Sequence, residues 1–292
     1  MTRSLAIAIA VQAVLAAAVG LVVLDMRAHN RVEELGGVNV WGYRGTELGR
    51  KRPHEVRIAV FGGDLAFGWG VRPTETLAHY TGRLVSVELN RPGRPSRPVT
   101  PIVAAARGMR PADFAGWMEH FSDLAIDVIL LVPDDPARRL DRERFLPDRQ
   151  AAVFAATRYS PILPLVLREK ARRTGSTMLG VAARLLESAD FNASSTPDAN
   201  GTLSDAWRDA LRAAQRIAAV GTVLVLPPGW DAPLEVTETP QLRIVRLDAD
   251  PGMRDPGLRL DGYHFSAGGH SRAAMSVAPV VLNLIGADGQ RP

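Results

Sequence analysis

The chain contains no cysteine among its 292 residues. This absence excludes a disulfide framework and a thiolate metal site, and it suits oxidising and reducing compartments alike. Lysine is nearly absent too: Lys51 and Lys170 are the only two, so the formal charge of +4 comes mainly from arginine. The arginines are scattered among acidic residues without interleaved aromatics. The basic stripe that nucleic-acid binding requires is therefore missing, and no nucleic-acid partner is expected.

The chain begins with one long apolar run. Residues 5–24 (LAIAIAVQAVLAAAVGLVVL) contain Gln12 as their only strongly polar residue, and about 20 apolar residues suffice to cross the hydrocarbon core of a bilayer. A cleaved signal peptide, the main alternative, has a shorter apolar region before a small-x-small site. We predict an uncleaved single-pass anchor over residues 1–25, with the bulk of the chain periplasmic or otherwise extracytoplasmic. Arginines flank the run on both sides, so the positive-inside rule does not decide the orientation.

The rest of the chain alternates short apolar runs with amphipathic segments. Buried strands are predicted over residues 56–61, 101–105, 127–132, 221–226 and 242–247, and helices over 74–88, 111–123, 159–188 and 266–285. Such alternation predicts an α/β domain with a parallel sheet covered on both faces. We place this domain at residues 55–290, with a helical and loop insertion over 136–203, and we expect residues 26–54 to be a linker that docks on it.

Polar side chains follow the ends of several predicted strands. Asp64 follows the first strand in GGDLAFG, and Asp134 and Asp135 follow the third in PDDP. Asp261 and His264 lie in DGYHFSAGGH, before the last helix. Ligands of open α/β sheets bind beyond the carboxyl ends of the strands. We therefore expect these side chains to gather at one rim of the sheet.

The chain resembles the SGNH/GDSL hydrolases over roughly residues 39–285, apart from the insertion. The resemblance rests on WGYRG at 41–45, on RIAVFGGDLAFGWGV at 57–71 in the place of the nucleophile block, and on DGYHFSAGGH at 261–270 in the place of the closing Asp-x-x-His block. It implies a three-layer α/β/α, flavodoxin-like SGNH fold and the hydrolysis of esters. It also implies that Asp261 orients His264 and that His264 acts as the base.

The motifs depart from the family pattern at the reacting positions. The family has a serine four residues before a glycine, and counting back from Gly68 places Asp64 there. The family's oxyanion-hole glycine corresponds to Ala105, or to Gly108 if the alignment slips, and its asparagine corresponds to Asp135 or Pro136. An ionised carboxylate has no proton to give to a base and is a weak nucleophile toward an ester. Loss of one oxyanion donor alone costs about 10²–10³ in rate.

Three interpretations of Asp64 stay open at this point. It could be a former catalytic position whose carboxylate now bonds to His264 or to backbone N–H groups. It could be a nucleophile for alkyl transfer, or a divalent-cation ligand together with Asp134 or Asp135. Alternatively, hydrolysis could continue through another serine or a water molecule, with His264 as the base.

The favoured hypothesis is a pseudoenzyme: a membrane-anchored protein that has lost catalysis and serves as a binding or structural subunit of a membrane or envelope complex. Its expected partners are the membrane and other membrane-protein subunits, reached through the N-terminal helix and the domain surface. No cofactor and no metal are expected. The alternative is an active esterase or O-acyl transferase that acts on cell-envelope esters, with His264 and Asp261 as the base pair.

Overall fold

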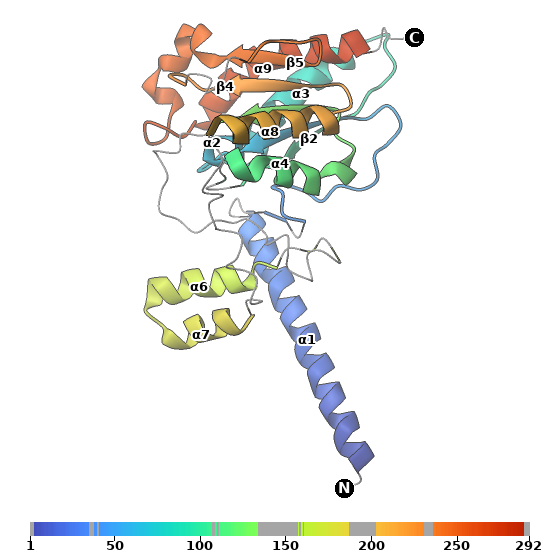
Figure 1. The fold of residues 1–292 in the computed structure, drawn as a ribbon, viewed down its shortest axis with the longest axis vertical. Helices are drawn as coiled ribbons and strands as arrows, with labels where there is room; N and C mark the ends of the chain where they lie inside the picture. Colours follow the sequence, from blue (N-terminus) through green and yellow to red (C-terminus); the bar gives the residue numbers. More distant parts are fainter. Residues whose placement is uncertain are drawn as a thin grey trace. The chain divides into compact units, whose positions relative to one another are not determined.

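The structure is a computed structural model of the full chain. It describes residues 3–34, 38–39, 41–106, 109, 111–133, 157, 159, 161–186, 203–230 and 236–288. The chain divides into two compact units (Figure 1). The first unit comprises Met1–Gly42 and Pro147–Thr196, and the second comprises Tyr43–Leu146 and Pro197–Pro292. The predicted insertion therefore contributes most of its residues to the unit that contains the N-terminal helix.

The first unit is helical. Its described residues form the helices α1 (Arg3–Glu34), α6 (Leu163–Thr174) and α7 (Thr177–Leu186). Within α1, the stretch Ser4–His29 is long and apolar enough to cross a membrane, and the helix continues to Glu34, into the range expected to be linker. The helical segment predicted over 159–188 is two helices, because Gly175 adopts a left-handed φ of 65° and ends α6.

The second unit contains a five-stranded parallel sheet. Its strands are β1 (Val56–Gly62), β2 (Val99–Val103), β3 (Val128–Val132), β4 (Gly221–Leu226) and β5 (Leu242–Arg246). Their order is β2-β1-β3-β4-β5, which is the strand order of the flavodoxin-like doubly wound folds. The register places Val60 of β1 beside Val103 and Leu130. The prediction of a parallel sheet is confirmed, with β2 shifted toward the amino terminus of its predicted range.

Helices cover both faces of this sheet, as predicted (Figure 1). One face carries α4 (Pro111–His120) and α8 (Leu203–Ile217), which pack against each other, and the other carries α3 (Leu77–Leu89) and α9 (Ala267–Asp288). The short helix α2 (Asp64–Phe67) follows β1 directly. Further 3₁₀ helices span Pro73–Glu75, Ser122–Leu124, Leu247–Ala249, Pro251–Arg254 and Pro256–Leu258. Among the α-helices that the structure describes in this unit, the one-turn α2 and the longer α8 have no counterpart among the predicted helices.

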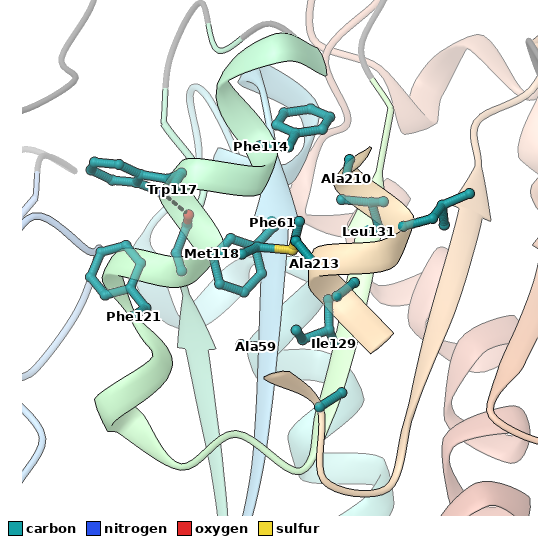
Figure 2. Close-up of a cluster of buried hydrophobic side chains, with 14 of the residues drawn as sticks. Ala59, Phe61, Phe114, Trp117, Met118, Phe121, Ile129, Leu131, Ala210 and Ala213 are labelled. Atoms are coloured by element: carbon teal, nitrogen blue, oxygen red, sulfur yellow. Dashed lines mark hydrogen bonds between the residues drawn. The ribbon is translucent and has the colours of Figure 1, made fainter. Parts of the chain in front are cut away.

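A buried core fills the space between the sheet and the α4/α8 layer (Figure 2). Side chains of one strand alternate between the two faces of a sheet, so Ala59 and Phe61 of β1 both point into this core. Residues at helical spacing on α4 face them, and they include Phe114 and Trp117. The Trp117 indole donates a hydrogen bond to the Ala104 carbonyl at 2.5 Å. This contact fixes the segment that follows β2, at the carboxyl rim of the sheet.

The tryptophans divide between core and surface. Trp117 and Trp207 are buried in this core, and Trp230 packs against it. These three side chains therefore have packing roles. Trp41 differs, because it is 38% exposed in the first unit, whereas its neighbour Tyr43 is buried in the core of the second.

Candidate functional site at the carboxyl rim of the sheet

The turn after β1 holds Asp64 at the start of α2. Gly62 has a φ of 153°, and a Cβ there would lie 2.2 Å from the Val132 carbonyl oxygen of β3. The strand can therefore approach β3 this closely only with glycine. Gly68 then ends α2 in the left-handed region, with a φ of 73°. The backbone geometry requires glycine at both positions, whether or not the site is catalytic. Together the two glycines fix the backbone on either side of Asp64.

Arg44 holds the segment 63–71, called the Asp64 loop below, through hydrogen bonds to its backbone carbonyls. Its guanidinium is buried and donates hydrogen bonds to the carbonyls of Phe67 at 2.6 Å, Gly68 at 2.7 Å and Val71. The backbone N–H of Arg44 also donates to the Val103 carbonyl at the end of β2, at 2.9 Å. Burial lowers the pKa of Arg44 to about 10, so the side chain stays cationic at neutral pH. The WGYRG segment thus contributes a positive charge beneath the Asp64 loop, a role that the sequence did not indicate.

A tight turn before α9 holds Asp261 and His264 together. One Asp261 oxygen accepts a hydrogen bond from the backbone N–H of His264 at 2.9 Å, and the other lies 2.6 Å from the His264 Nδ1. The Leu260 N–H donates to the His264 carbonyl at 2.8 Å and closes the turn. Asp261 therefore fixes both the backbone and the ring of His264, which is the pairing that the Asp-x-x-His block predicted.

Asp64 and His264, 200 positions apart in the chain, meet at this rim. The Asp64 Oδ2 lies 3.8 Å from the Nε2 of His264, and the two side chains are 13% and 4% exposed. This separation suits an ion pair but exceeds hydrogen-bond length, and Nε2 has no hydrogen-bond partner among the residues that the structure describes. His264 thus lies between two carboxylates, with Asp261 on Nδ1 and Asp64 facing Nε2.

The two carboxylates control the charge of His264. Burial alone would lower its pKa, but Asp64 and Asp261 outweigh burial, and the pKa of His264 is raised. Burial would likewise raise the pKa of Asp261, but the hydrogen bonds from His264 prevail and hold it below its usual value. Because both ring nitrogens face negative charge, the imidazolium form of His264 is stabilised relative to the neutral ring, and the imidazolium has no lone pair with which to accept a proton.

Two further histidines lie near this site, and the sequence indicated neither. His270, on the first turns of α9, is 1% exposed, and neither ring nitrogen has a hydrogen-bond partner within the described part of the chain. Burial, aided by the charges of Arg44 and His264, lowers the pKa of His270 to about 3. Burial also lowers the pKa of His79 to about 4, and its Nδ1 lies 3.1 Å from the Thr76 hydroxyl. Of these three histidines, only His264 has a raised pKa.

The positions that correspond to the oxyanion hole are described only in part. Ala105, the second residue after β2, is fully buried, and the neighbouring Ala106 N–H donates to the Gly62 carbonyl at 3.2 Å. Gly108, Asp134, Asp135 and Pro136 lie outside the described residues. The structure therefore brings together Asp64, Asp261 and His264 of the predicted site. The roles predicted for the remaining positions stay predictions.

Other potential binding features lie away from this rim. Among the described residues, no group of three or more His, Asp or Glu side chains could hold a metal ion. One surface pocket of about 370 Å³ lies at the C-terminal ends of α3 and α9, where Glu88, Arg94 and Leu282 line it. None of its lining residues belongs to the Asp64–His264–Asp261 cluster.

Comparison with known proteins adds no identification. No protein-family model matches the chain, and no curated protein matches it significantly.

Proposed function

We propose that this chain is a membrane-anchored, extracytoplasmic relative of the SGNH/GDSL hydrolases that lacks ester hydrolysis and serves as a binding or structural subunit of an envelope complex. The observation that carries the proposal is the 3.8 Å contact between the Asp64 carboxylate and the Nε2 of His264. Nε2 is the nitrogen that would take a proton from a nucleophile, because Asp261 occupies Nδ1. A carboxylate therefore stands where the mechanism needs a hydroxyl.

Two chemical consequences support loss of catalysis. A general base is most effective when it is unprotonated at the working pH, whereas the raised pKa of His264 favours its protonated form. Attack by the Asp64 carboxylate on an ester would form an anhydride, which is less stable than the ester. Protonated His264 therefore cannot activate a nucleophile, and Asp64 cannot form a lower-energy acyl intermediate.

The surrounding scaffold supports a retained non-catalytic role. Arg44 makes hydrogen bonds to three carbonyls of the Asp64 loop, and Gly62 keeps β1 against β3. These contacts keep the backbone around Asp64 in place even though the catalytic serine of the family is missing. The apolar Ser4–His29 segment supports attachment to a membrane, where that surface would meet other envelope components.

Turnover of a chromogenic short-chain ester tests the loss of catalysis. We expect no turnover by the wild-type chain, and we expect the Asp64→Ser variant to gain turnover and to react with a fluorophosphonate probe. The double variant Asp64→Ser/His264→Ala is the matched control and should show neither. Turnover by the wild type that disappears in His264→Ala would overturn the proposal.

Co-purification tests the subunit role separately. The full-length chain, extracted in mild detergent, should elute with one or more membrane proteins in a stable ratio. A chain that elutes alone after gentle extraction contradicts the role as a complex subunit, whatever the ester assay shows.

One observation favours the second candidate, an active envelope esterase or O-acyl transferase. The Asp261–His264 pair is intact, with 2.6 Å between Oδ2 and Nδ1. A neutral His264 could activate water or an alcohol directly. This candidate requires wild-type turnover that rises with pH as His264 loses its proton, so a pH series of the same ester assay distinguishes it.

A further inference from the structure

The first unit contains a polar junction between α1 and α6. Asp25 of α1 accepts hydrogen bonds from the backbone N–H groups of Ile162 at 2.9 Å and Leu163 at 2.6 Å, and also from the Tyr159 hydroxyl. These N–H groups begin α6, so Asp25 caps that helix from a distant part of the chain. His29, one turn further along α1, lies 3.5 Å from the same carboxylate. The start of α6 is thereby fixed to one level of α1.

That level is the end of the apolar run. Residues 5–24 contain no charged residue, and Asp25 is the first one after them. If α1 crosses a bilayer, Asp25 marks the boundary between hydrocarbon and headgroups. The hairpin of α6 and α7 then begins at the membrane surface. In Figure 1, α7 lies on the side of α6 nearer the amino-terminal end of α1, which is the bilayer side.

The composition of the hairpin matches an interfacial position. Residues 161–186 contain the basic residues Arg168, Lys170, Arg172, Arg173 and Arg184, against Glu169 as the only acid. On α7, Met178 and Val181 are 82% and 50% exposed. They are three residues apart and so share one helix face. An apolar helix face in a segment with an excess of basic residues is the pattern of a helix that lies in a membrane interface.

We propose that the α6–α7 hairpin lies on the bilayer that α1 crosses, with α7 inserted at the level of the headgroups and the excess positive charge of the hairpin attracted to anionic lipid phosphates. The proposal rests on the membrane anchoring proposed above. A lipid surface is favoured over a protein partner because the Asp25 contacts set the hairpin at the bilayer boundary, and because its excess of basic charge complements anionic lipids. The hairpin would then hold α1 at a fixed depth.

The absence of native cysteine makes a depth measurement direct. Single cysteines are introduced into the full-length chain by Met178→Cys, Val14→Cys or Val87→Cys, and each carries an environment-sensitive fluorophore. Val14 lies in the middle of the apolar run and is 69% exposed. Val87, 68% exposed on α3 of the second unit, is the matched control for Met178. The labelled chains are reconstituted in phosphatidylcholine vesicles containing phosphatidylglycerol, with nitroxide lipids at two depths.

The proposal predicts a different response from each label. The label at 178 should shift its emission to shorter wavelength and be quenched most by the shallow nitroxide, because an interfacial helix lies about 5–10 Å into the headgroup boundary. The label at 14 should be quenched most by the deep nitroxide, and the label at 87 by neither. Quenching at 14 with none at 178 overturns the hairpin proposal and leaves the anchor intact. No quenching at 14 overturns the anchor and the hairpin proposal together.

Two further measurements separate the causes. Replacing phosphatidylglycerol by phosphatidylcholine should reduce quenching at 178 and leave quenching at 14 unchanged; equal quenching at 178 contradicts the role of anionic lipid. Adding Asp25→Ala should weaken quenching at 178 without affecting position 14, because the start of α6 is no longer fixed. Unchanged quenching at 178 in that variant shows that Asp25 does not set the position of the hairpin.

Discussion

Within the described part of the chain, each unit contains a buried histidine beside aspartate, and the two sites differ in what surrounds the carboxylates. In the first unit, Asp25 lies 3.5 Å from His29, but it also accepts two backbone N–H groups and a tyrosine hydroxyl. In the second unit, Asp64 and Asp261 lie on opposite sides of a single imidazole. A carboxylate bonded to backbone donors fixes the position of a helix, whereas carboxylates on both sides of a histidine fix its charge.

Displacing the backbone at Gly62, two residues before Asp64, should have the largest effect on stability. Gly62→Ala forces a Cβ toward the Val132 carbonyl oxygen, at 2.2 Å, and imposes a strained φ. We expect the free energy of unfolding to fall by about 3–4 kcal/mol, as measured by urea denaturation followed by tryptophan fluorescence. Gly93→Ala is the control, since Gly93 also has a positive φ but nothing within 4 Å of its added Cβ. Equal losses in both variants would show that the contact with β3 is unimportant.

Removing Arg44 should have the next largest effect. Arg44→Met eliminates the hydrogen bonds to three loop carbonyls and leaves those carbonyls buried. The expected loss is about 2–4 kcal/mol, because relief from burying a charge offsets part of the cost. Arg83→Met is the matched control: both guanidiniums stack on an aromatic ring, Arg44 on Phe67 and Arg83 on Tyr80, but Arg83 is exposed. We expect less than about 0.5 kcal/mol there, and similar losses in the two variants would contradict a loop-closing role.

Asp25 provides the corresponding test in the first unit. Asp25→Ala should destabilise the start of α6 by about 1–2 kcal/mol, the range for loss of an N-cap. Faster cleavage in the 159–186 segment during limited proteolysis would report this change. Asp25→Asn keeps one acceptor oxygen and should stay close to wild type. A large effect of the asparagine variant would mean that charge, rather than capping, holds the junction.

The smallest expected effect is on the titration of His264. Asp64→Asn should lower the pKa of His264, which NMR of its ring protons can follow, because one of the charges that raise it is removed. Asp261→Asn should also lower this pKa, whereas Asp209→Asn, on the exposed face of α8, should not change it. An unchanged pKa in Asp64→Asn would remove the electrostatic argument for a protonated histidine.

The same shift makes stability depend on pH. The pKa of His264 is higher in the folded chain than its unfolded value of about 6.5. The stabilisation is therefore complete below the unfolded pKa and is lost as the pH rises through the folded pKa. Asp64→Asn should flatten this part of the stability profile. A wild-type profile without any decline over this range would contradict the shift.

Much of the second unit was predictable because its strands are continuous apolar runs. Residues 56–61 and 221–226 match β1 and β4 closely, since a strand buried on both faces has few polar positions. The meeting of Asp64 with His264 followed from the rule that strand ends share one rim. In contrast, β2 contains Pro101 and begins earlier than predicted. The prediction also missed α8, although its buried apolar face and charged outer face are the pattern of an amphipathic helix.

The contacts that could not be predicted join distant segments through side chains. Arg44 lies in a glycine-rich stretch that resembled a linker, and only the folded loop supplies its three carbonyl partners. Asp25 looked like the polar end of an anchor, and its partners lie more than 130 positions away. Sequence periodicity indicates which face of a helix or strand is buried. It carries no information about single polar contacts between segments that are far apart in the sequence.

Arg44 also determines where the chain can be shortened. It lies two residues after Gly42, where the first unit ends. A truncation that removes the anchor could easily remove this stretch as well. A soluble fragment that begins after this residue would contain every strand and helix of the sheet domain, yet its Asp64 loop would lack the guanidinium that closes it. Inactivity or poor ligand binding by such a fragment would reflect the missing arginine, and a fragment that begins at or before residue 41 avoids this error.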